Sequence, residues 1–330
     1  MRHELLEYIR CPICKKVEFE LQTAVTDQRE IREGTLTCRA CQTSYPISKG
    51  IIDLMPNPDQ TIQSEQQGWS ELLGETSEEL VDTMLQLPHY GEDLLWHNVA
   101  KSFDDIMAKV DFKGKKVLDI GAGRCWSTRH MVLAGASYAV GVDIITERFI
   151  GLETADIFLE HDNIYFERII GDMNNLPVRP NTFDIAFMTA TLHHTSNPNQ
   201  AMQEMANALA PGGIAVLINE PVGGLLQKNT LDGCVEIEHG INENVYSLRE
   251  YLNAARQAGL KPSISLSPVV KEELSKNPNQ IVHRFGRLGR YALLPMWRYA
   301  LGQRLIGGLL LPFLHLAANM PLTMIAKKPV

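Results

Sequence analysis

The sequence predicts an α/β protein in which a doubly wound, mostly parallel sheet follows a small N-terminal module. Strand-like apolar runs alternate with helix-like stretches from residue 115 onward, which is the pattern of a parallel sheet covered by helices on both faces. Two close pairs of cysteines near the N-terminus mark the small module. With 330 residues, the chain is long enough for one large domain and a small one.

Composition limits the compartment and the partners. The hydrophobic fraction is 45%, so a sizeable core is available, and the formal net charge of −8 argues against a general polyanion binder. The first residues, MRHELLEYIRCP, lack the apolar stretch of a secretory signal. We therefore expect a soluble protein of the reducing cytoplasm, where paired cysteines hold metal more often than they form disulfides.

The N-terminal module, residues 1–56, has the cysteine spacing of a zinc ribbon. CPIC and CRAC are separated by 23 residues, and two such knuckles suit the tetrahedral thiolate coordination of zinc. The intervening stretches EFELQTAV and EIREGTLTC alternate like the strands of a hairpin. A module this small gains from a metal staple, so structural zinc is favoured over two disulfides or a redox pair of free thiols. The expected ligands are Cys11, Cys14, Cys38 and Cys41.

Residues 57–110 are predicted to form a linker and a helical lid. The stretch PNPDQTIQSEQQG at 56–68 is polar and contains two prolines, which is typical of a linker. Apolar residues in 91–110 recur near the helical period. These helices either cover a ligand pocket or pack on the sheet edge, and the sequence leaves both possibilities open.

The large module, residues 111–330, contains the predicted sheet. A helix at 197–210 should begin with Asn197 as its N-cap and end at Gly212. A later helix should start with a capping box formed by Ser247 and Glu250. The first five strands are expected at 115–122, 137–144, 164–173, 183–194 and 214–221.

Glycines and acidic residues at the strand ends predict the ligand, because ligands of such sheets bind beyond the carboxyl ends of the strands. Gly121 and Gly123 follow the first strand and let backbone N–H groups approach a ligand. A tryptophan stands where a dinucleotide site has its third glycine. Asp143 ends the second strand, where a carboxylate can accept both ribose hydroxyls. Asp172 and Met173 end the third strand and can meet an adenine, so the pocket fits an adenosine without phosphates.

These motifs resemble those of class I S-adenosylmethionine-dependent methyltransferases, of the methyltransferase type 11-like group, over residues 115–221. The matching stretches are VLDIGAG, GVDI, GDMNNLPVRPNTFDIAFMTATLHHTSNP and EMANALAPGGIAVLINEP. Residues 1–56 resemble the zinc-ribbon family that activates RNA and protein methyltransferases as a separate small subunit. The resemblance implies a seven-stranded Rossmann-like sheet, S-adenosylmethionine as cofactor, and these cofactor-binding residues: Asp119, Gly121, Ala122, Gly123, Asp143, Ile144, Asp172, Met173 and Thr189. One departure, Cys125 in place of a third glycine, is expected to alter loop packing rather than cofactor identity.

The candidate catalytic residues are His193, His194 and Glu220. Methyl transfer from a sulfonium is an in-line displacement in which the enzyme mainly aligns the reacting atoms. An oxygen or nitrogen acceptor can also need its proton removed, and a neutral imidazole beyond the fourth strand is a suitable base. Glu220 ends the fifth strand and could bind a hydroxyl or a cation. The alternatives are histidines that only shape the pocket and an ordinary strand-end carboxylate.

A basic and apolar insert at about 269–320 separates the expected sixth strand, KPSISLSP, from the last strand, LTMIAKKP. Residues 271–330 carry nine Lys or Arg against two Glu, with aromatics interleaved, and 305–326 carries no charge. Three interpretations compete: a pocket for a lipid-linked acceptor with peripheral membrane contact through 281–320, a strip that binds RNA, and a packing or dimer face. A membrane-spanning helix is disfavoured because Pro312 and Pro321 interrupt the apolar run.

The favoured function is an S-adenosylmethionine-dependent methyltransferase that acts on a small-molecule or lipid-linked acceptor. Nucleic acid is a less favoured partner, because the basic field is local. The alternatives are an RNA methyltransferase acting on rRNA or tRNA and a non-catalytic methyltransferase-like binding subunit. A cytoplasmic protein in contact with membranes is the location expected with the favoured function.

Overall fold

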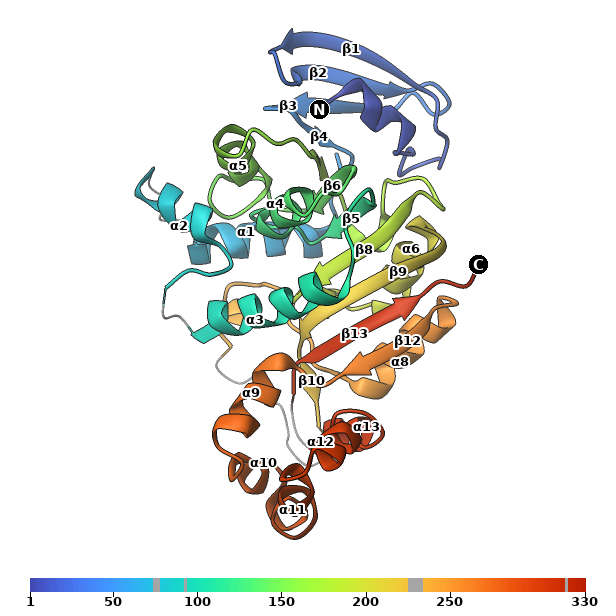
Figure 1. The fold of residues 1–330 in the computed structure, drawn as a ribbon. Coiled ribbons are helices and arrows are strands. Elements are labelled where there is room, and N and C mark those ends of the chain that lie inside the picture. The colour runs from blue at the N-terminus through green and yellow to red at the C-terminus, as the bar shows by residue number, and fades with distance from the viewer. Residues whose placement is uncertain (74–77, 92–93, 225–233, 318–319) are drawn as a thin grey trace.

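An eleven-stranded sheet runs through the computed structural model, which describes residues 1–73, 78–91, 94–224, 234–317 and 320–330. The strand order is β1-β2-β3-β4-β7-β6-β5-β8-β9-β13-β12 (Figure 1). The last seven strands of this order form the sheet predicted for the large module. They are β5 (Lys116–Ile120), β6 (Tyr138–Asp143), β7 (Glu167–Ile170), β8 (Phe183–Thr189), β9 (Leu209–Glu220), β12 (Lys261–Ser265) and β13 (Leu322–Lys327).

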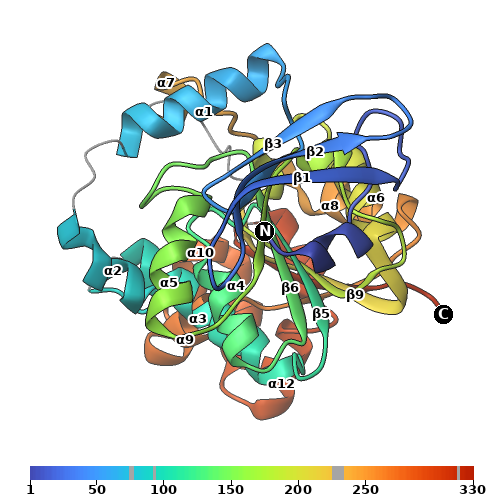
Figure 2. The same cartoon turned by 90° about the horizontal axis from the view of Figure 1, so that it is seen from above.

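The seven-stranded part is mostly parallel and doubly wound, as predicted. β7, β6, β5, β8 and β9 pair in parallel, and only β13 runs antiparallel to its two neighbours, β9 and β12. Helices cover both faces (Figure 2). One hydrophobic cluster joins the sheet to Met205 and Tyr251, and the other joins it to Phe103 and Phe158.

The N-terminal strands continue this sheet rather than forming one of their own. They are β1 (Phe19–Thr26), β2 (Ile31–Cys38), β3 (Ser44–Ser48) and β4 (Ile51–Asp53), and β1 and β2 form the predicted hairpin. β4 pairs in parallel with β7, with Ile52 opposite Ile169. A single cluster of buried residues includes both Leu5 and Leu118, so the two predicted modules share a core. The domain boundary at residue 56 remains a prediction.

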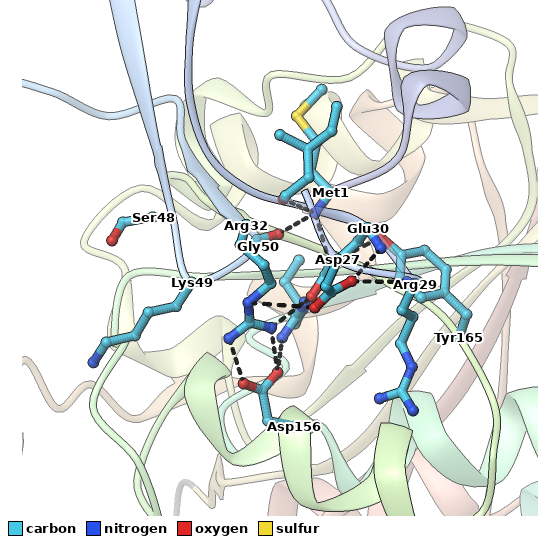
Figure 3. A network of polar contacts seen from close by, with 12 residues as sticks. Met1, Asp27, Arg29, Glu30, Arg32, Ser48, Lys49, Gly50, Asp156 and Tyr165 are labelled. Carbon is cyan, nitrogen blue, oxygen red and sulfur yellow. Dashed lines mark hydrogen bonds and ion pairs between the residues drawn. The ribbon is translucent and has the colours of Figure 1, made fainter. Parts of the chain in front are cut away.

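Buried charges also join the two parts (Figure 3). The amino group of Met1 donates to a carboxylate oxygen of Glu30 at 2.6 Å. Arg168 on β7 donates to both oxygens of Glu30, at 2.5 and 2.6 Å, and also to Asp156. Arg32 on β2 bridges Glu30 and Asp156 as well. The side chains of Glu30 and Arg168 are fully buried.

The expected linker at 56–68 is mostly helical, so that interpretation of the stretch is wrong. α1 (Gln60–Leu73) begins just after the two prolines, and the Asp59 carboxylate accepts a hydrogen bond from the backbone N–H of Ile62 at 2.9 Å. The stretch is polar because this helix lies at the surface, with only Glu65 and Gly68 buried and its other residues exposed or partly exposed. The other helices before the insert are α2 (Val81–Gln86), α3 (Leu94–Lys109), α4 (Trp126–Leu133), α5 (Ala155–His161), α6 (Pro198–Ala208), α7 (Val235–Glu238) and α8 (Leu248–Gln257).

The predicted helix caps are present, but α6 ends earlier than predicted. Asn197 caps α6, and Ser247 and Glu250 form the capping box of α8. α6 ends at Ala208 instead of at Gly212, because β9 begins at Leu209 and pairs with Phe183 before an irregularity in the register. A short pair of parallel strands, β10 (Val222–Gly223) and β11 (Tyr246–Ser247), lies between β9 and α8.

The insert forms a helical cluster with its own core. It contains α9 (Pro268–Lys276), α10 (Gln280–Leu288), α11 (Leu294–Trp297), α12 (Ala300–Ile306) and α13 (Leu311–Ala317). Buried apolar side chains such as Leu274, Leu293 and Trp297 hold these helices together. Among the described residues, no helix is both long and apolar enough to cross a membrane.

Candidate functional site

A cavity of about 380 Å³ lies beyond the carboxyl ends of the central parallel strands. The loops after β5, β6, β7 and β8 form its base, and α1 contributes the side chains that cover it. This placement follows the rule for open parallel sheets. Of the predicted residues, the cavity is lined by Gly121, Ala122, Gly123, Asp143, Ile144, Asp172, Met173, Thr189 and His194.

The loop after β5 requires glycine for two reasons. Gly121 and Gly123 have φ values of +70° and +48°, in the left-handed region. A Cβ on Gly121 would also lie 2.2 Å from Cγ2 of Thr191, well inside contact distance. Cys125 adopts φ +60° at the start of α4 and is fully buried. It therefore takes the backbone conformation of the glycine it replaces without reaching the cavity.

Asp143 ties the glycine loop to the end of β6. Its two carboxylate oxygens accept hydrogen bonds from the backbone N–H groups of Gly123, at 2.7 Å, and Ile145, at 2.8 Å. Burial raises the pKa of Asp143. Asp172 accepts from the N–H of Asn174 in the same way, at 2.7 Å, and fixes the turn that carries Met173.

Asp119 does not line the cavity, in contrast to the position expected from the resemblance. Its carboxylate is fully buried and accepts hydrogen bonds from the hydroxyl groups of Ser127 and Thr128 on α4, at 2.6 and 2.5 Å. Burial raises its pKa to about 6. Asp119 is thus placed to hold the start of α4 under the glycine loop.

The three predicted catalytic residues come together, but only His194 lines the cavity. Glu220 is fully buried and accepts hydrogen bonds from the backbone N–H groups of Thr191 and Leu192, at 2.8 and 2.9 Å. It also contacts Nδ1 of His193 at 2.9 Å. Glu220 and His193 therefore fix the loop after β8 and lie behind the cavity wall.

The two histidines differ in charge. Burial lowers the pKa of His193, but contacts with Glu220 and Glu243 outweigh it and raise that pKa to about 10. Burial and the neighbouring charge of His193 lower the pKa of His194. Nδ1 of His194 lies 2.7 Å from the carbonyl oxygen of Asn242. A carbonyl only accepts, so Nδ1 carries the proton of the neutral ring.

Sequence reasoning missed several cavity residues on α1 and on the glycine loop. Thr61, Glu65, Trp69 and Leu73 follow one another at intervals of four and line the cavity from one face of α1. Residues four apart lie on the same face of a helix, so this spacing could have identified the four residues from the sequence. Burial and the charge of Asp143 raise the pKa of Glu65 to about 8.

Arg124 was also missed, although it follows the quoted glycine motif directly. It lines the cavity, and burial lowers its pKa. Its Nε donates to the carbonyl oxygen of Phe149 at 2.6 Å. Two tryptophans, Trp96 and Trp126, line the cavity as well.

The four N-terminal cysteines form the second candidate site. The sulfur atoms of Cys11, Cys14, Cys38 and Cys41 all lie within 4.8 Å of one another. All four cysteines are free, and the separations of 3.5 Å for Cys14–Cys38 and 3.6 Å for Cys11–Cys41 are far longer than the ~2.05 Å of a disulfide. Sulfurs bound to zinc at ~2.3 Å in a tetrahedron are about 3.8 Å apart. The four residues therefore fit a zinc ion.

Comparison with known families confirms both resemblances. Residues 118–217 match the family described as "Methyltransferase domain", and residues 2–50 match "Trm112p-like protein". The structure also resembles the [4+2]-cyclase SpnF, with a TM-score of 0.51 and 19% identity over 83% of this chain and 98% of that one. At this identity the likeness shows the shared fold alone, which agrees with the predicted fold class.

Two relatives bear on the acceptor. The tRNA U34 carboxymethyltransferase of Campylobacter hominis is 31% identical over 121 residues, 37% of this chain and 41% of that protein. The protein of the same name from Alcanivorax borkumensis is 28% identical over 125 residues, 38% of this chain and 36% of that protein. The chain thus spans about two-fifths of the length of these relatives.

These relatives overturn the expected acceptor and partner. A small-molecule or lipid-linked acceptor was favoured and nucleic acid was ranked lower, yet both relatives are named for an activity on tRNA. A basic field confined to one part of the chain therefore does not exclude a nucleic-acid acceptor. We therefore set aside the lipid-linked acceptor and the membrane contact through 281–320 that was expected with it.

Proposed function

We propose that the protein is an S-adenosylmethionine-dependent methyltransferase that modifies RNA, with tRNA as the acceptor class. The observation that carries the proposal is the cavity at the ends of β5, β6 and β7, in a chain that matches the methyltransferase-domain family. When bound, S-adenosylmethionine supplies an activated methyl group. The chain's own residues bind it, orient it and exclude water from it.

The cavity fits an adenosine that carries an amino-acid chain. We assign adenine to Asp172 and Met173, which follow β7, and ribose to Asp143, which ends the neighbouring β6; all three line the cavity. Arg124 brings a positive charge to the same cavity. We assign it to the carboxylate of the methionine part, because guanidinium groups pair well with carboxylates.

The acceptor end of the cavity is next to β8. This strand flanks β5 on the side away from β6 and β7, so its loop borders the space that ribose and adenine leave free. His194 lines the cavity from this loop. We assign His194 to the acceptor, and Glu220 and His193 to positioning the loop.

The insert supports an RNA acceptor through its charge and its position. Residues 268–317 contain seven Lys or Arg against two Glu, in a chain of net charge −8. The insert leaves β12 at its carboxyl end, and β12 runs in the same direction as β9, so the insert starts at the edge that carries the cavity. An ion pair between Lys101 and Glu272 joins α9 to α3.

Exposed side chains on the insert suit nucleic acid. Tyr291 and Tyr299 are 74% and 71% exposed and follow the exposed Arg290 and Arg298 in the sequence. The guanidinium carbon of Arg290 lies 5.8 Å from the centroid of the Tyr291 ring. Arginines contact phosphates, and aromatic rings stack on unpaired bases. We further propose that the four cysteines hold structural zinc and that the protein acts in the cytoplasm, where tRNA is found.

Incubation with donor labelled on the methyl group and with total cellular RNA tests the proposal. Label in the tRNA fraction that ribonuclease removes is the expected result. Label that extracts into organic solvent would overturn the assignment of RNA. Donor binding by calorimetry without any transferred label would instead identify a non-catalytic binding subunit. The Arg290→Gln/Arg298→Gln variant should lose labelling of RNA while keeping its affinity for S-adenosylhomocysteine.

A further inference from the structure

Two histidines and a glutamate converge beside the acceptor end of the cavity. His193 and His194 come from the loop after β8, and Glu243 comes from the loop before β11. One ligand atom from each of the three lies within 4.8 Å of the other two. The imidazole centroids are 4.2 Å apart. Three side chains that commonly bind metals therefore meet at one point from two separate loops.

The contacts from the two histidines to Glu243 are longer than ordinary hydrogen bonds. Nε2 of His193 lies 3.5 Å from one oxygen of Glu243, and Nδ1 of His194 lies 3.6 Å from the other. Side-chain hydrogen bonds are shorter than this, at ~2.7–3.2 Å. Two nitrogen or oxygen ligands bound at ~2.1 Å in a tetrahedron are about 3.4 Å apart. The two observed distances are close to this value, so the spacing is compatible with a shared ion.

Three carboxylates border the group, and a bound cation would be a further partner for them. The side chains of Glu65 and Glu220 are buried, and that of Glu243 is partly exposed. Within the described chain, no lysine or arginine forms an ion pair with any of the three; their only such contacts are with His193 and His194. Buried carboxylates are stable when they are paired or bound to a metal.

Glu220 supplies the support that a metal-binding histidine needs. It contacts Nδ1 of His193 at 2.9 Å, which leaves Nε2 facing Glu243. A carboxylate that orients a histidine through its second nitrogen is the usual outer shell of a metal site. The contact of His194 Nδ1 with the carbonyl oxygen of Asn242 is the one that an ion would replace. The freed carbonyl is then a further oxygen donor.

We propose that His193, His194 and Glu243 bind a divalent first-row transition metal ion at the acceptor end of the cavity. Two imidazoles and a carboxylate suit Mn²⁺, Fe²⁺, Co²⁺ or Zn²⁺ rather than Ca²⁺. Three protein ligands leave a coordination position open, and His194 places it at the cavity wall. The site would take an oxygen of the acceptor and lower its pKa by acting as a Lewis acid. This last role rests on the proposed function, whereas the metal site does not.

Manganese binding to the full-length protein tests the site without donor or RNA. Mn²⁺ prefers oxygen and nitrogen ligands and leaves a thiolate zinc site undisturbed, so the two sites are measured separately. Elemental analysis reports the zinc, and the loss of the free Mn²⁺ signal in electron paramagnetic resonance reports the second ion. The variants are Glu243→Gln and His194→Gln. The matched control is Glu238→Gln, an exposed carboxylate on α7.

We expect the wild-type protein to bind one Mn²⁺ per chain in addition to the zinc held by the cysteines. Glu243→Gln and His194→Gln should each weaken Mn²⁺ binding at least ~tenfold, while their zinc content and melting temperature stay unchanged. Glu238→Gln should bind as the wild type does. No Mn²⁺ uptake by the wild type, or equal affinity in all the variants, would overturn the proposal. Either result would leave RNA methylation to be judged by its own assay.

Discussion

Replacing Glu30 by glutamine removes the charge that joins the N-terminal strands to the large sheet. Glu30 accepts from the Met1 amino group at 2.6 Å, from Arg168 at 2.5 and 2.6 Å, and from Arg32 at 2.7 Å. Figure 3 shows Met1 and Arg32 beside this carboxylate. The amide in Glu30→Gln keeps the shape of the side chain but leaves the buried guanidinium of Arg168 without this partner.

The size of the effect follows from the pKa of Glu30. Burial alone would raise this pKa, but the charge and hydrogen bonds of Arg168 and the Met1 amino group outweigh burial and lower it from 4.5 to about 2. A shift of about 2.5 units corresponds to ~3.4 kcal/mol at 1.36 kcal/mol per unit. Breaking a buried ion pair by removing one partner costs ~3–5 kcal/mol. We expect a loss of about 3 kcal/mol in the free energy of unfolding at pH 7.

The pH dependence has a definite sign. Because the folded pKa of Glu30 is below the unfolded one, its contribution is complete above pH 4.5 and is lost as the pH falls toward 2. The wild type should therefore lose this stability over that range. In Glu30→Gln the same part of the acid dependence should be absent.

Urea unfolding followed by two signals is the assay. All four tryptophans lie outside residues 1–56, three in helices beside the large sheet and Trp297 in the insert, so their fluorescence reports the large module, while release of zinc reports the cysteine site. In both proteins the two transitions should coincide, because the two parts share a sheet and a core. The control is Glu20→Gln, which changes an exposed carboxylate on β1. A loss below ~1 kcal/mol, or zinc release at a lower urea concentration than the fluorescence change, would refute the reasoning.

Three further predictions concern the cavity, the zinc site and the insert. Asp143→Ala should raise the Kd for S-adenosylhomocysteine at least ~tenfold, about 1.5 kcal/mol, because charged hydrogen bonds are lost; calorimetry with unchanged affinity would remove Asp143 from the site. Cys38→Ser should release the metal and weaken binding of the same ligand; full zinc content by elemental analysis would contradict the assignment. His315 is buried in the insert, and burial lowers its pKa to about 4. Its folded pKa is below the unfolded value of 6.5, so stability should fall by up to ~3.4 kcal/mol as the pH drops from 6.5 to 4. Melting temperatures measured across that range should show this loss in the wild type but not in His315→Leu.

Strands and caps were predictable from the sequence because local chemistry decides them. The buried central strands appear as continuous apolar runs, and Ser247 with Glu250 satisfies the first N–H groups of α8 wherever that helix packs. The pairing of β4 with β7 was not predictable. It depends on two short strands more than 100 residues apart in the sequence, and no periodicity encodes which edge a strand joins.

The cavity was predictable at its base and not at its walls. Glycines and aspartates at strand ends are fixed by strand geometry, so Gly121, Asp143 and Asp172 fall where expected. Which of two adjacent histidines faces the ligand depends on the loop conformation after β8, and the loop is held by Glu220 from another strand. The sequence does not distinguish a histidine that faces the cavity from a neighbouring histidine that only supports the loop. Only the tertiary contacts separate His194, in the cavity wall, from His193 behind it.

The N-terminal strands have a direct physical connection to the cavity despite their place at the far edge of the sheet. β4 pairs with β7 at Ile169 and Ile170, and Leu54 donates a backbone hydrogen bond to the carbonyl oxygen of Ile170 at 3.0 Å. Asp172 lies two residues beyond this bond. The chain then passes from β4 into α1, whose side chains line the cavity. Loss of the metal should loosen β4, which pairs with β7, and α1, which follows β4 and covers the cavity. We therefore expect Cys38→Ser to weaken ligand binding as well as to lower the zinc content.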